Sequence, residues 1–460
     1  MTAHAIDKAG SDDNPIAIGL EDKVPIWSSV VYGLQHIVAM FAGIVAVPLI
    51  VGSAIGLPPD QKTILVQACL LTSGIGTILQ TSRIWFIGAR LPICMGTAFV
   101  FITPMIAIGN VHGVAGIIGG LMVGGIAEFL VAPYIWRIKH VFPPLVTGTV
   151  IALIGLSLIP VGFRWMAGGF GALYGKPIAY LISGSVLVIM IGANRFASGY
   201  IRTVSVIVAV IAGYLIAGIF GLVDFSVVGT SSWFAPPKLF AFGAPTFSVG
   251  AIVGVLVAQF GNMLETIGNT FATNAVLENE TAPAHLRGAI AVDGIGSFIG
   301  AIFGGFSITS FAQNIGVIGI TGVGSRHVVR VAGILLILMA LFPKFAAVIV
   351  AMPDPVLGGA GIVMFGAIVA AGVHQLAAKG MDQRDMTIFA TAIGVGLGCG
   401  LSGPEAFASF PQELQIILRS GIVMGSIIVI LMNLLLPAQK KTGIEIAPAA
   451  ARGGGVVTEV

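Results

Sequence analysis

Apolar stretches about as long as a membrane crossing follow one another along almost the whole chain, separated by short polar turns. A helix needs about 20 predominantly apolar residues to cross a bilayer. The pattern therefore predicts an all-α polytopic membrane protein with fourteen transmembrane segments. They lie at residues 27–51, 61–81, 91–109, 112–135, 143–161, 177–193, 201–221, 246–268, 286–304, 308–323, 329–351, 355–375, 385–401 and 417–437.

Two of these segments are too short or too interrupted to be simple helices. Segment 91–109 contains Pro92, Gly96 and Pro104, and segment 308–323 contains the amide pair Gln313-Asn314 among Gly, Ser and Thr residues. Polar side chains and broken backbone at membrane depth are costly unless they line a polar site. We therefore expect a binding site in these two segments.

The chain also divides into two halves of seven segments each, joined by an irregular loop around residues 231–237. The interrupted segments are the third of each half, and they begin at nearly the same distance from its start. In inverted-repeat transporters, interrupted segments at matching places mark the binding site. The pattern predicts a site near the membrane midplane, where the segment of Ala98 and the segment of Gln313 face each other.

Composition agrees with a membrane protein and excludes several other classes. The chain is 57% hydrophobic and only 9% charged, whereas soluble proteins carry about 25% charged residues. A net charge of +3 is too small and too dispersed to indicate a nucleic-acid partner. The three cysteines lie in separate apolar segments without metal-ligand spacing. No nucleophile–base pair or metal-ligand cluster indicates an enzyme, and no cofactor is expected.

The ends of the chain and its basic residues predict an orientation. Residues 1–24 and 439–460 are polar and are expected to form disordered tails. The N-terminal one lacks the features of a cleaved signal peptide, so the first segment is expected to be retained. With both termini in the cytoplasm, sixteen of the 22 Lys and Arg residues fall on the cytoplasmic side of the inner or plasma membrane, as the positive-inside rule requires.

Glu265 is the first candidate for proton coupling. Burial of a carboxylate costs several kcal/mol unless it is protonated or paired, so a carboxyl group in a segment is a functional candidate by default. Asn262, Glu265 and Asn269 are spaced i, i+3 and i+7 and share one helix face. This face is typical of a polar site, although Glu265 in a structural pair remains the alternative.

Other polar side chains in the segments leave two interpretations open. Gln35-His36 either makes a helix–helix hydrogen bond or orients the substrate segment, and Asp293 is either a structural anchor or a coupling residue. Glu128 lies near the cytoplasmic end of its segment with Arg137 beyond it, and this position favours a structural role. His112 lies near a loop, where water can reach it.

The run from Gln313 to Gly322 resembles the signature of the nucleobase/ascorbate transporters, the second family of nucleobase-cation symporters. That signature is Gln or Glu, Asn, any residue, Gly, four further residues, Thr, and Arg, Lys or Gly. Four more places resemble the family and extend the resemblance over nearly the whole chain. They are Gln35-His36 in the first segment, Gly96-Thr97-Ala98-Phe99 in the third, Glu265-Thr266-Ile267-Gly268 in the eighth and Asp293 in the ninth.

The resemblance implies a seven-plus-seven inverted repeat with a core domain and a gate domain. The core would consist of residues 25–140 and 246–352, and the gate of residues 141–245 and 353–438. Short antiparallel strands in segments three and ten would meet at the substrate. The family also implies a homodimer packed through the gate domain, in contact with membrane lipid, and an elevator-like movement of the core.

The resemblance also implies the residue roles. Glu265 and Gln313 would hydrogen-bond the substrate, Phe99 would stack on its ring, and backbone groups near Ala98 and Ala312 would complete the site. Phe311 and Asn269 are further substrate-binding candidates. Asp293 would help to couple the proton, although sodium remains possible as the coupling ion, while Asn314, His36 and Gln35 would support the site.

Substrate choice follows from two positions. Gln313 together with Gly322 resembles the xanthine and uric acid branch of the family, whereas the uracil branch typically has Glu and Arg there. Asn269 departs from the pattern, because xanthine carriers typically have Asp at this place. The sequence thus predicts proton-coupled uptake of xanthine or uric acid, with a uracil symporter as one alternative. An anion channel or carrier of the same architecture is the alternative from a different class.

Overall fold

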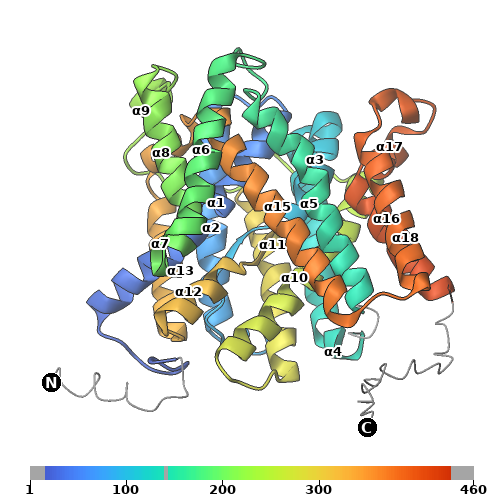
Figure 1. The fold of residues 1–460 in the computed structure, drawn as a ribbon, viewed down its shortest axis with the longest axis horizontal. Helices are drawn as coiled ribbons and strands as arrows, with labels where there is room; N and C mark the ends of the chain where they lie inside the picture. The colour runs from blue at the N-terminus through green and yellow to red at the C-terminus, as the bar shows by residue number, and fades with distance from the viewer. Residues whose placement is uncertain (1–15, 139–142, 437–460) are drawn as a thin grey trace, which may run out of the picture.

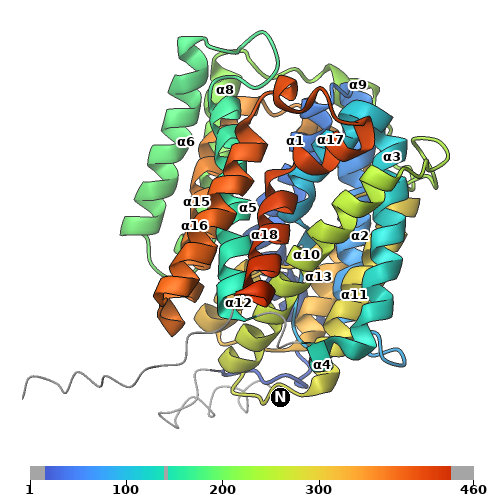
Figure 2. The same cartoon turned by 90° about the vertical axis from the view of Figure 1, so that its right-hand side faces the viewer.

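The computed structural model describes residues 16–138 and 143–436, which form a bundle of helices with one short strand pair inside it (Figure 1). The predicted C-terminal tail and the first fifteen residues of the predicted N-terminal tail lie outside the described residues. The prediction of an all-helical membrane protein is confirmed. Figure 2 shows that most of the long helices run roughly along one direction, as in a membrane-embedded bundle.

Eight predicted segments coincide with single long helices. These are α1 (Ile26–Ala54), α2 (Pro59–Thr81), α5 (Pro144–Met166), α6 (Pro177–Phe196), α10 (Val249–Val276), α11 (Pro283–Ile302), α15 (Asp354–Lys379) and α16 (Gln383–Leu401).

The other segments are broken or composed of two elements. They comprise β1 (Met95–Thr97), η1 (Phe99–Phe101) and α3 (Ile102–Val131), then α7 (Gly199–Thr203) with α8 (Ser205–Ile219), β2 (Ile308–Ser310) with α12 (Gln313–Thr321), α13 (Arg326–Ala340) with α14 (Pro343–Val350), and α17 (Gln412–Leu418) with α18 (Gly421–Leu435). Within the described residues, seven helices are long and apolar enough to cross a membrane, or nine if each of two sharply bent pairs counts as one span. Fourteen crossings therefore stay a prediction.

Gly113 separates the third and fourth predicted segments inside one continuous helix assignment. Its backbone lies at φ 63° and ψ −168°, a conformation that breaks the helical path of α3. A residue with a side chain adopts this region only with strain, whereas glycine adopts it freely. The two predicted segments thus meet at a glycine break, close to the boundary that the sequence indicates.

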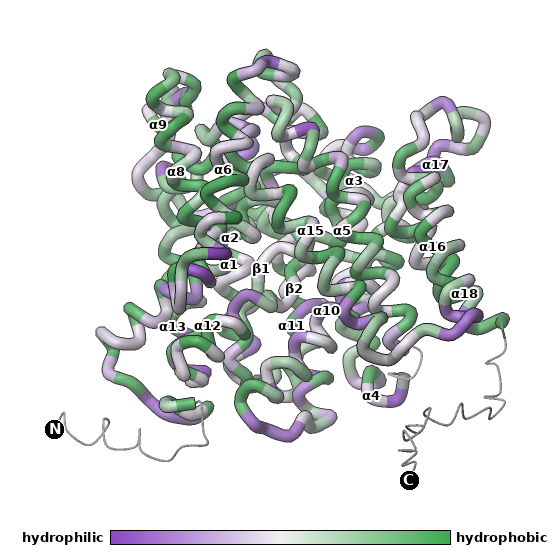
Figure 3. Tube along the Cα trace, viewed as in Figure 1, coloured by the Kyte–Doolittle hydropathy of each residue, from purple (hydrophilic) through white to green (hydrophobic). Residues whose placement is uncertain are grey.

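β1 and β2 pair in antiparallel orientation, which confirms the expected strands in segments three and ten. Met95 lies opposite Ser310 and Thr97 lies opposite Ile308. All six strand residues are buried, and Figure 3 shows the pair near the centre of the bundle. Each strand is followed directly by a helix, η1 after β1 and α12 after β2.

Glycines allow the long helices to approach closely. A Cβ atom on Gly74 of α2 would lie 2.6 Å from the backbone oxygen of Gly333 in α13. The same holds between α5 and α15, where a Cβ on Gly372 would lie 2.4 Å from the backbone nitrogen of Ala152. Small residues favour such contacts in lipid, where no hydrophobic force drives helices together. This explains many of the 64 glycines in the chain.

The residues just before α1 are held against the bundle. Ile18 exchanges backbone hydrogen bonds with Gly322 and Gly324 at 3.0 and 2.8 Å. Glu21 accepts a 2.6 Å hydrogen bond from the Arg326 guanidinium and pairs with Arg90 at 3.0 Å. Of the predicted tail, residues 16–24 therefore lie against the chain that follows α12.

We predict that this contact makes stability depend on pH in a defined direction. The hydrogen bond from Arg326 lowers the pKa of Glu21 below its ordinary value. A lowered pKa means that the stabilisation is fully present above the pKa of the unfolded chain and is lost as the pH falls through the folded value. Glu21→Gln should therefore lower the melting temperature at pH 7, and the difference from wild type should vanish as the pH falls below about 4. Thermal unfolding of the purified protein across this range measures it, and a difference that grows on acidification would contradict the contact.

Candidate functional site

The polar face of α10 is attached to strand β2. Asn262 donates a hydrogen bond of 3.1 Å to the backbone oxygen of Ile308, and Asn269 donates one of 2.8 Å to that of Ser310. The Asn269 amide also reaches the Ser310 hydroxyl at 3.0 Å. The shared face that the sequence predicts is thus present, and two of its three side chains bind the strand.

Thr266 is a third contact on this face that the sequence analysis missed. Its hydroxyl lies 3.3 Å from the Thr309 hydroxyl and accepts a hydrogen bond of 3.1 Å from the Ser310 hydroxyl. Thr266 lies four residues after Asn262 and so continues the same helical face. This spacing could have indicated the contact from the sequence, but threonine is less unusual in an apolar helix than an amide side chain is.

Strand β1 is fixed from the other side by α1. The Thr97 hydroxyl donates hydrogen bonds to the backbone oxygens of Ile44 at 2.9 Å and Gly43 at 3.2 Å. The next N–H, that of Ala98, donates to the backbone oxygen of Ser307 at 2.9 Å. The Ala98 amide hydrogen, expected to be near the substrate, is therefore already paired in this structure.

Phe311 packs directly after β2 rather than facing open space. Its side chain is buried, and its ring lies over Gly43 of α1 and Gly96 of β1. A Cβ atom on Gly96 would lie 2.6 Å from this ring, and one on Gly43 would lie 2.7 Å from it. The ring thus joins α1 to both strands, and its predicted contact with substrate stays a prediction.

Phe99 begins η1 at the end of β1 and reaches a helix of the predicted gate. Its ring lies edge-on to that of Phe365 in α15, with centroids 6.0 Å apart and an interplanar angle of 77°. The side chain is 7% exposed. This contact links the strand pair with α15, which packs against α5 in the predicted gate.

The end of β2 carries the accessible polar groups. Gln313, the first residue of α12, and Ala312 before it are exposed. Glu265 is partly exposed, one helical turn before Asn269, which binds the last residue of β2. Among the described residues, no hydrogen bond or ion pair satisfies the Glu265 carboxyl group. An amide and a carboxyl group are thus both available near this strand end.

His36 of α1 and Asn314 of α12 are in direct contact, and their predicted role as support of the site stays a prediction. The Asn314 amide nitrogen lies 3.0 Å from His36 Nδ1 and 3.3 Å from the His36 backbone oxygen, and both side chains are buried. Gln35 makes a different contact, since its backbone oxygen accepts a 3.0 Å hydrogen bond from the Tyr200 hydroxyl in α7. His36 therefore binds within the predicted core, whereas Gln35 lies where core meets gate.

Asp293 lies on α11, is fully buried, and interacts with the Thr266 hydroxyl on the strand-binding face of α10. Its carboxyl group is close enough to those of Glu128 in α3 and Glu265 in α10 to interact electrostatically with both. Glu128, expected to have a structural role, is also buried and accepts a hydrogen bond from the Gln259 amide. Two carboxyl groups thus lie behind the strand pair.

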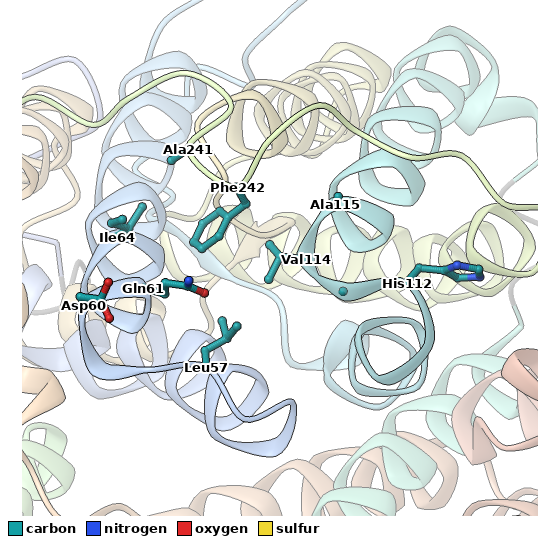
Figure 4. A pocket seen from close by; sticks show the side chains of 10 residues that line it. Leu57, Asp60, Gln61, Ile64, His112, Val114, Ala115, Ala241 and Phe242 are labelled. Carbon is teal, nitrogen blue, oxygen red and sulfur yellow. The ribbon is translucent and has the colours of Figure 1, made fainter.

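A separate cavity of about 580 Å³ opens elsewhere in the bundle. Figure 4 shows it between the start of α2 and the break of α3, with Phe242 of the loop before α10 on one side. His112 lines it and pairs with Glu413 at 3.5 Å, a partly exposed position that agrees with the expected contact with water. None of the predicted substrate residues lines this cavity.

Comparison with known proteins identifies the family. A profile described as Permease family, for xanthine and uracil permeases, matches residues 27–402. The chain belongs to the xanthine/uracil permeases, the second family of nucleobase-cation symporters. It is a transporter and not an enzyme. This confirms the resemblance that Gln313, Glu265 and their neighbours indicate in the sequence.

The relatives span nearly the whole chain. Uric acid permease PucJ of Bacillus subtilis is 39% identical over 415 residues, 89% of this chain and 92% of PucJ. The xanthine permease of the same organism is 34% identical over 405 residues, 88% of this chain and 92% of that protein. The transmembrane domain of the cyanobacterial bicarbonate transporter BicA has a similar fold, with a TM-score of 0.58 at 15% identity, covering 90% of this chain and 99% of that one.

We predict that Gly96 cannot take a side chain. In Gly96→Ala, the new Cβ meets the Phe311 ring, and overpacking of this kind costs about 1–3 kcal/mol. The purified variant should unfold at a lower temperature than wild type. Gly184→Ala in α6 is the matched control, because a Cβ there meets nothing within 4 Å. Equal unfolding temperatures for both variants would show that the Phe311 contact does not constrain the strand.

Proposed function

We propose that the chain carries an oxidised purine, xanthine or uric acid, across the membrane together with a proton. The observation that carries this proposal is that a carboxyl group, Glu265, and an exposed amide, Gln313, are both available near the end of β2. A neutral amide both donates and accepts hydrogen bonds, which fits the alternating C=O and N–H groups on the edge of an oxidised purine. The names of the PucJ and xanthine permease relatives agree with this substrate class.

The remaining contacts follow from the surroundings of the strands. Phe99 would stack on the purine ring, as aromatic faces do well. Since the Ala98 N–H is already paired with Ser307, we expect backbone groups next to Ala98, together with those near Ala312, to complete the set. Phe311 would hold β1 in place through the contact of its ring with Gly96.

Proton coupling would depend on Glu265. A carboxyl group without a cationic partner in a membrane interior is stabilised by taking up a proton. Asn269, one turn later, has no ionisable group and is bonded to Ser310. Glu265 would thus be the only proton acceptor on this face of α10, with Asp293 behind it as a second coupling residue.

We further propose that transport proceeds by an elevator movement of a core against a gate in a seven-plus-seven inverted repeat. Matching strand–helix breaks in both halves support the repeat. In the proposed core, α2 packs against both α11 and α13, and in the proposed gate α5 packs against α15, α16 and α18. Both termini would be cytoplasmic, and two copies would associate through the gate.

One observation favours a second candidate, an anion carrier. The fold resembles that of a bicarbonate transporter, and a fold hosts more than one function. An anion carrier would need no proton-accepting carboxyl group at the substrate. The partly exposed Glu265 beside the strand end favours the nucleobase.

The substrate class is tested by uptake of labelled xanthine and uric acid into proteoliposomes, with unlabelled competitors. Xanthine or uric acid should compete, uracil should compete weakly, and bicarbonate should not compete. With a proton gradient of one pH unit and one proton per substrate, accumulation should approach about tenfold and collapse with a protonophore. Competition by uracil alone would overturn the purine assignment. Uptake that only equilibrates would indicate a channel.

Glu265→Gln should abolish uphill uptake, because the amide retains the shape of the side chain but cannot bind a transported proton. The accumulation ratio should fall to about one under the same gradient. Glu405→Gln, in the exposed short helix η4 (Pro404–Phe407), is the matched control and should accumulate substrate as wild type does. Normal accumulation by Glu265→Gln would remove this residue from the coupling mechanism.

A further inference from the structure

A second polar cluster lies behind the strand pair, on faces of α3, α10 and α11 that meet inside the bundle. Its side chains are Glu128, Gln259, Asn262 and Asp293, and none of them is more than 1% exposed. It is buried, whereas Glu265 and Gln313 near the end of β2 are accessible.

Close packing of α3 on α11 sets the two carboxyl groups at the same level. A Cβ on Gly125 would lie 2.7 Å from the backbone oxygen of Gly294, and a Cβ on Gly294 would lie 2.5 Å from the backbone nitrogen of Phe129. Glu128 lies between Gly125 and Phe129 on α3, and Asp293 directly precedes Gly294 on α11. The two helices thus approach so closely at this level that no side chain fits between their backbones.

Helix α10 contributes the amides. Gln259 donates to Glu128 Oε2, so its side chain points into the cluster, and its own oxygen remains unpartnered. Asn262 uses its nitrogen on the Ile308 backbone oxygen and likewise retains an unpartnered oxygen.

The unpartnered atoms of the cluster are all acceptors. They are Glu128 Oε1, both carboxyl oxygens of Asp293, Gln259 Oε1 and Asn262 Oδ1. The Thr266 hydroxyl also interacts with the Asp293 carboxyl group, and the Asn262 amide with that of Glu128, so the acceptors of the cluster still outnumber its donors. Buried acceptors without donors are costly, and two neighbouring carboxylates cannot both remain charged away from water. The cluster therefore lacks a positive charge or a hydrogen atom, and a proton provides both.

No side chain supplies that charge. Within residues 16–138 and 143–436, neither Glu128 nor Asp293 forms an ion pair. The nearest cation along α11 is Arg287, six residues before Asp293 and about 9 Å along the helix axis, with its guanidinium 6.0 Å from the Phe86 ring centroid. From α10, Glu265 adds a further carboxyl group that acts on Asp293. Helix α4 (Ile135–Ile138), which packs against α11, carries the exposed Arg137, and this side chain forms no ion pair with either carboxyl group.

From this geometry we infer that Glu128 and Asp293 together hold one proton, and that this buried pair is a second proton-binding site of the transport cycle. An O–H bond forms on one carboxylate with a proton from the solution on one side of the membrane. The hydrogen is shared with the other carboxylate, and the bond breaks when the proton leaves to water on the opposite side. Glu128 thereby has a coupling role, and this role rests on the proposed proton-coupled transport.

The first test needs no substrate. Infrared difference spectra between acid and neutral pH should contain the C=O band of a protonated, buried carboxylic acid in the wild-type protein. That band should disappear or shift in both Glu128→Gln and Asp293→Asn, and should persist in Glu405→Gln. Because one proton is shared, the double variant should lose no more of the band than either single variant. A band that both single variants retain would overturn the inference.

The second test separates coupling from binding. Glu128→Gln should bind labelled xanthine or uric acid within about threefold of wild type, a small change in free energy, and should exchange it across the membrane at equal pH. Its accumulation under a proton gradient should fall to about one. If this variant does not fold, Asp293→Asn is examined in the same way. Accumulation by Glu128→Gln at the wild-type level would overturn the inference. It would also be overturned if a sodium gradient drove accumulation by the wild type but not by Glu128→Gln, because the cluster would then be a sodium site. Failure of wild type to bind any purine would instead contradict the proposed function and leave the infrared result intact.

Discussion

Polar backbone inside a membrane protein must find its hydrogen-bond partners within the protein, and the β1–β2 pair is where this requirement is most severe. Two strands of three residues each satisfy only some of each other's backbone hydrogen-bonding groups. Helix α10 satisfies Ile308 and Ser310 with two amides, and Thr97 binds α1 in turn. The position of α10 on the strands, and so that of Glu265, depends on these bonds.

Small residues make this arrangement possible. Gly96 and Gly43 leave room for the Phe311 ring, and glycines in the long helices bring backbones into contact. The same close approach between α3 and α11 places Glu128 opposite Asp293. Packing by small residues therefore both builds the bundle and decides which ionisable groups meet inside it.

The polar interior has two parts with different access to water. Near the end of β2, Gln313 and Glu265 are accessible, as a site that loads and releases a solute requires. Behind the strands, the carboxyl groups of Glu128 and Asp293 are sealed among α3, α10 and α11. Burial suits the second group to hold a proton rather than to contact a solute, because exclusion of water disfavours charged carboxylates.

Hydrophobic periodicity was enough to predict the membrane class and most helix positions. The motifs that resemble the family, above all the Gln313–Gly322 run, predicted the family and with it the strands in segments three and ten. These features are local, since a span needs a set number of apolar residues and broken backbone needs polar neighbours. The sequence could not reveal that Thr266 binds the strand, that Phe311 packs on two glycines, or that Glu128 faces Asp293 across 165 positions of the chain. Such contacts depend on how helices far apart in sequence are rotated and shifted against each other, and only the tertiary packing sets that register.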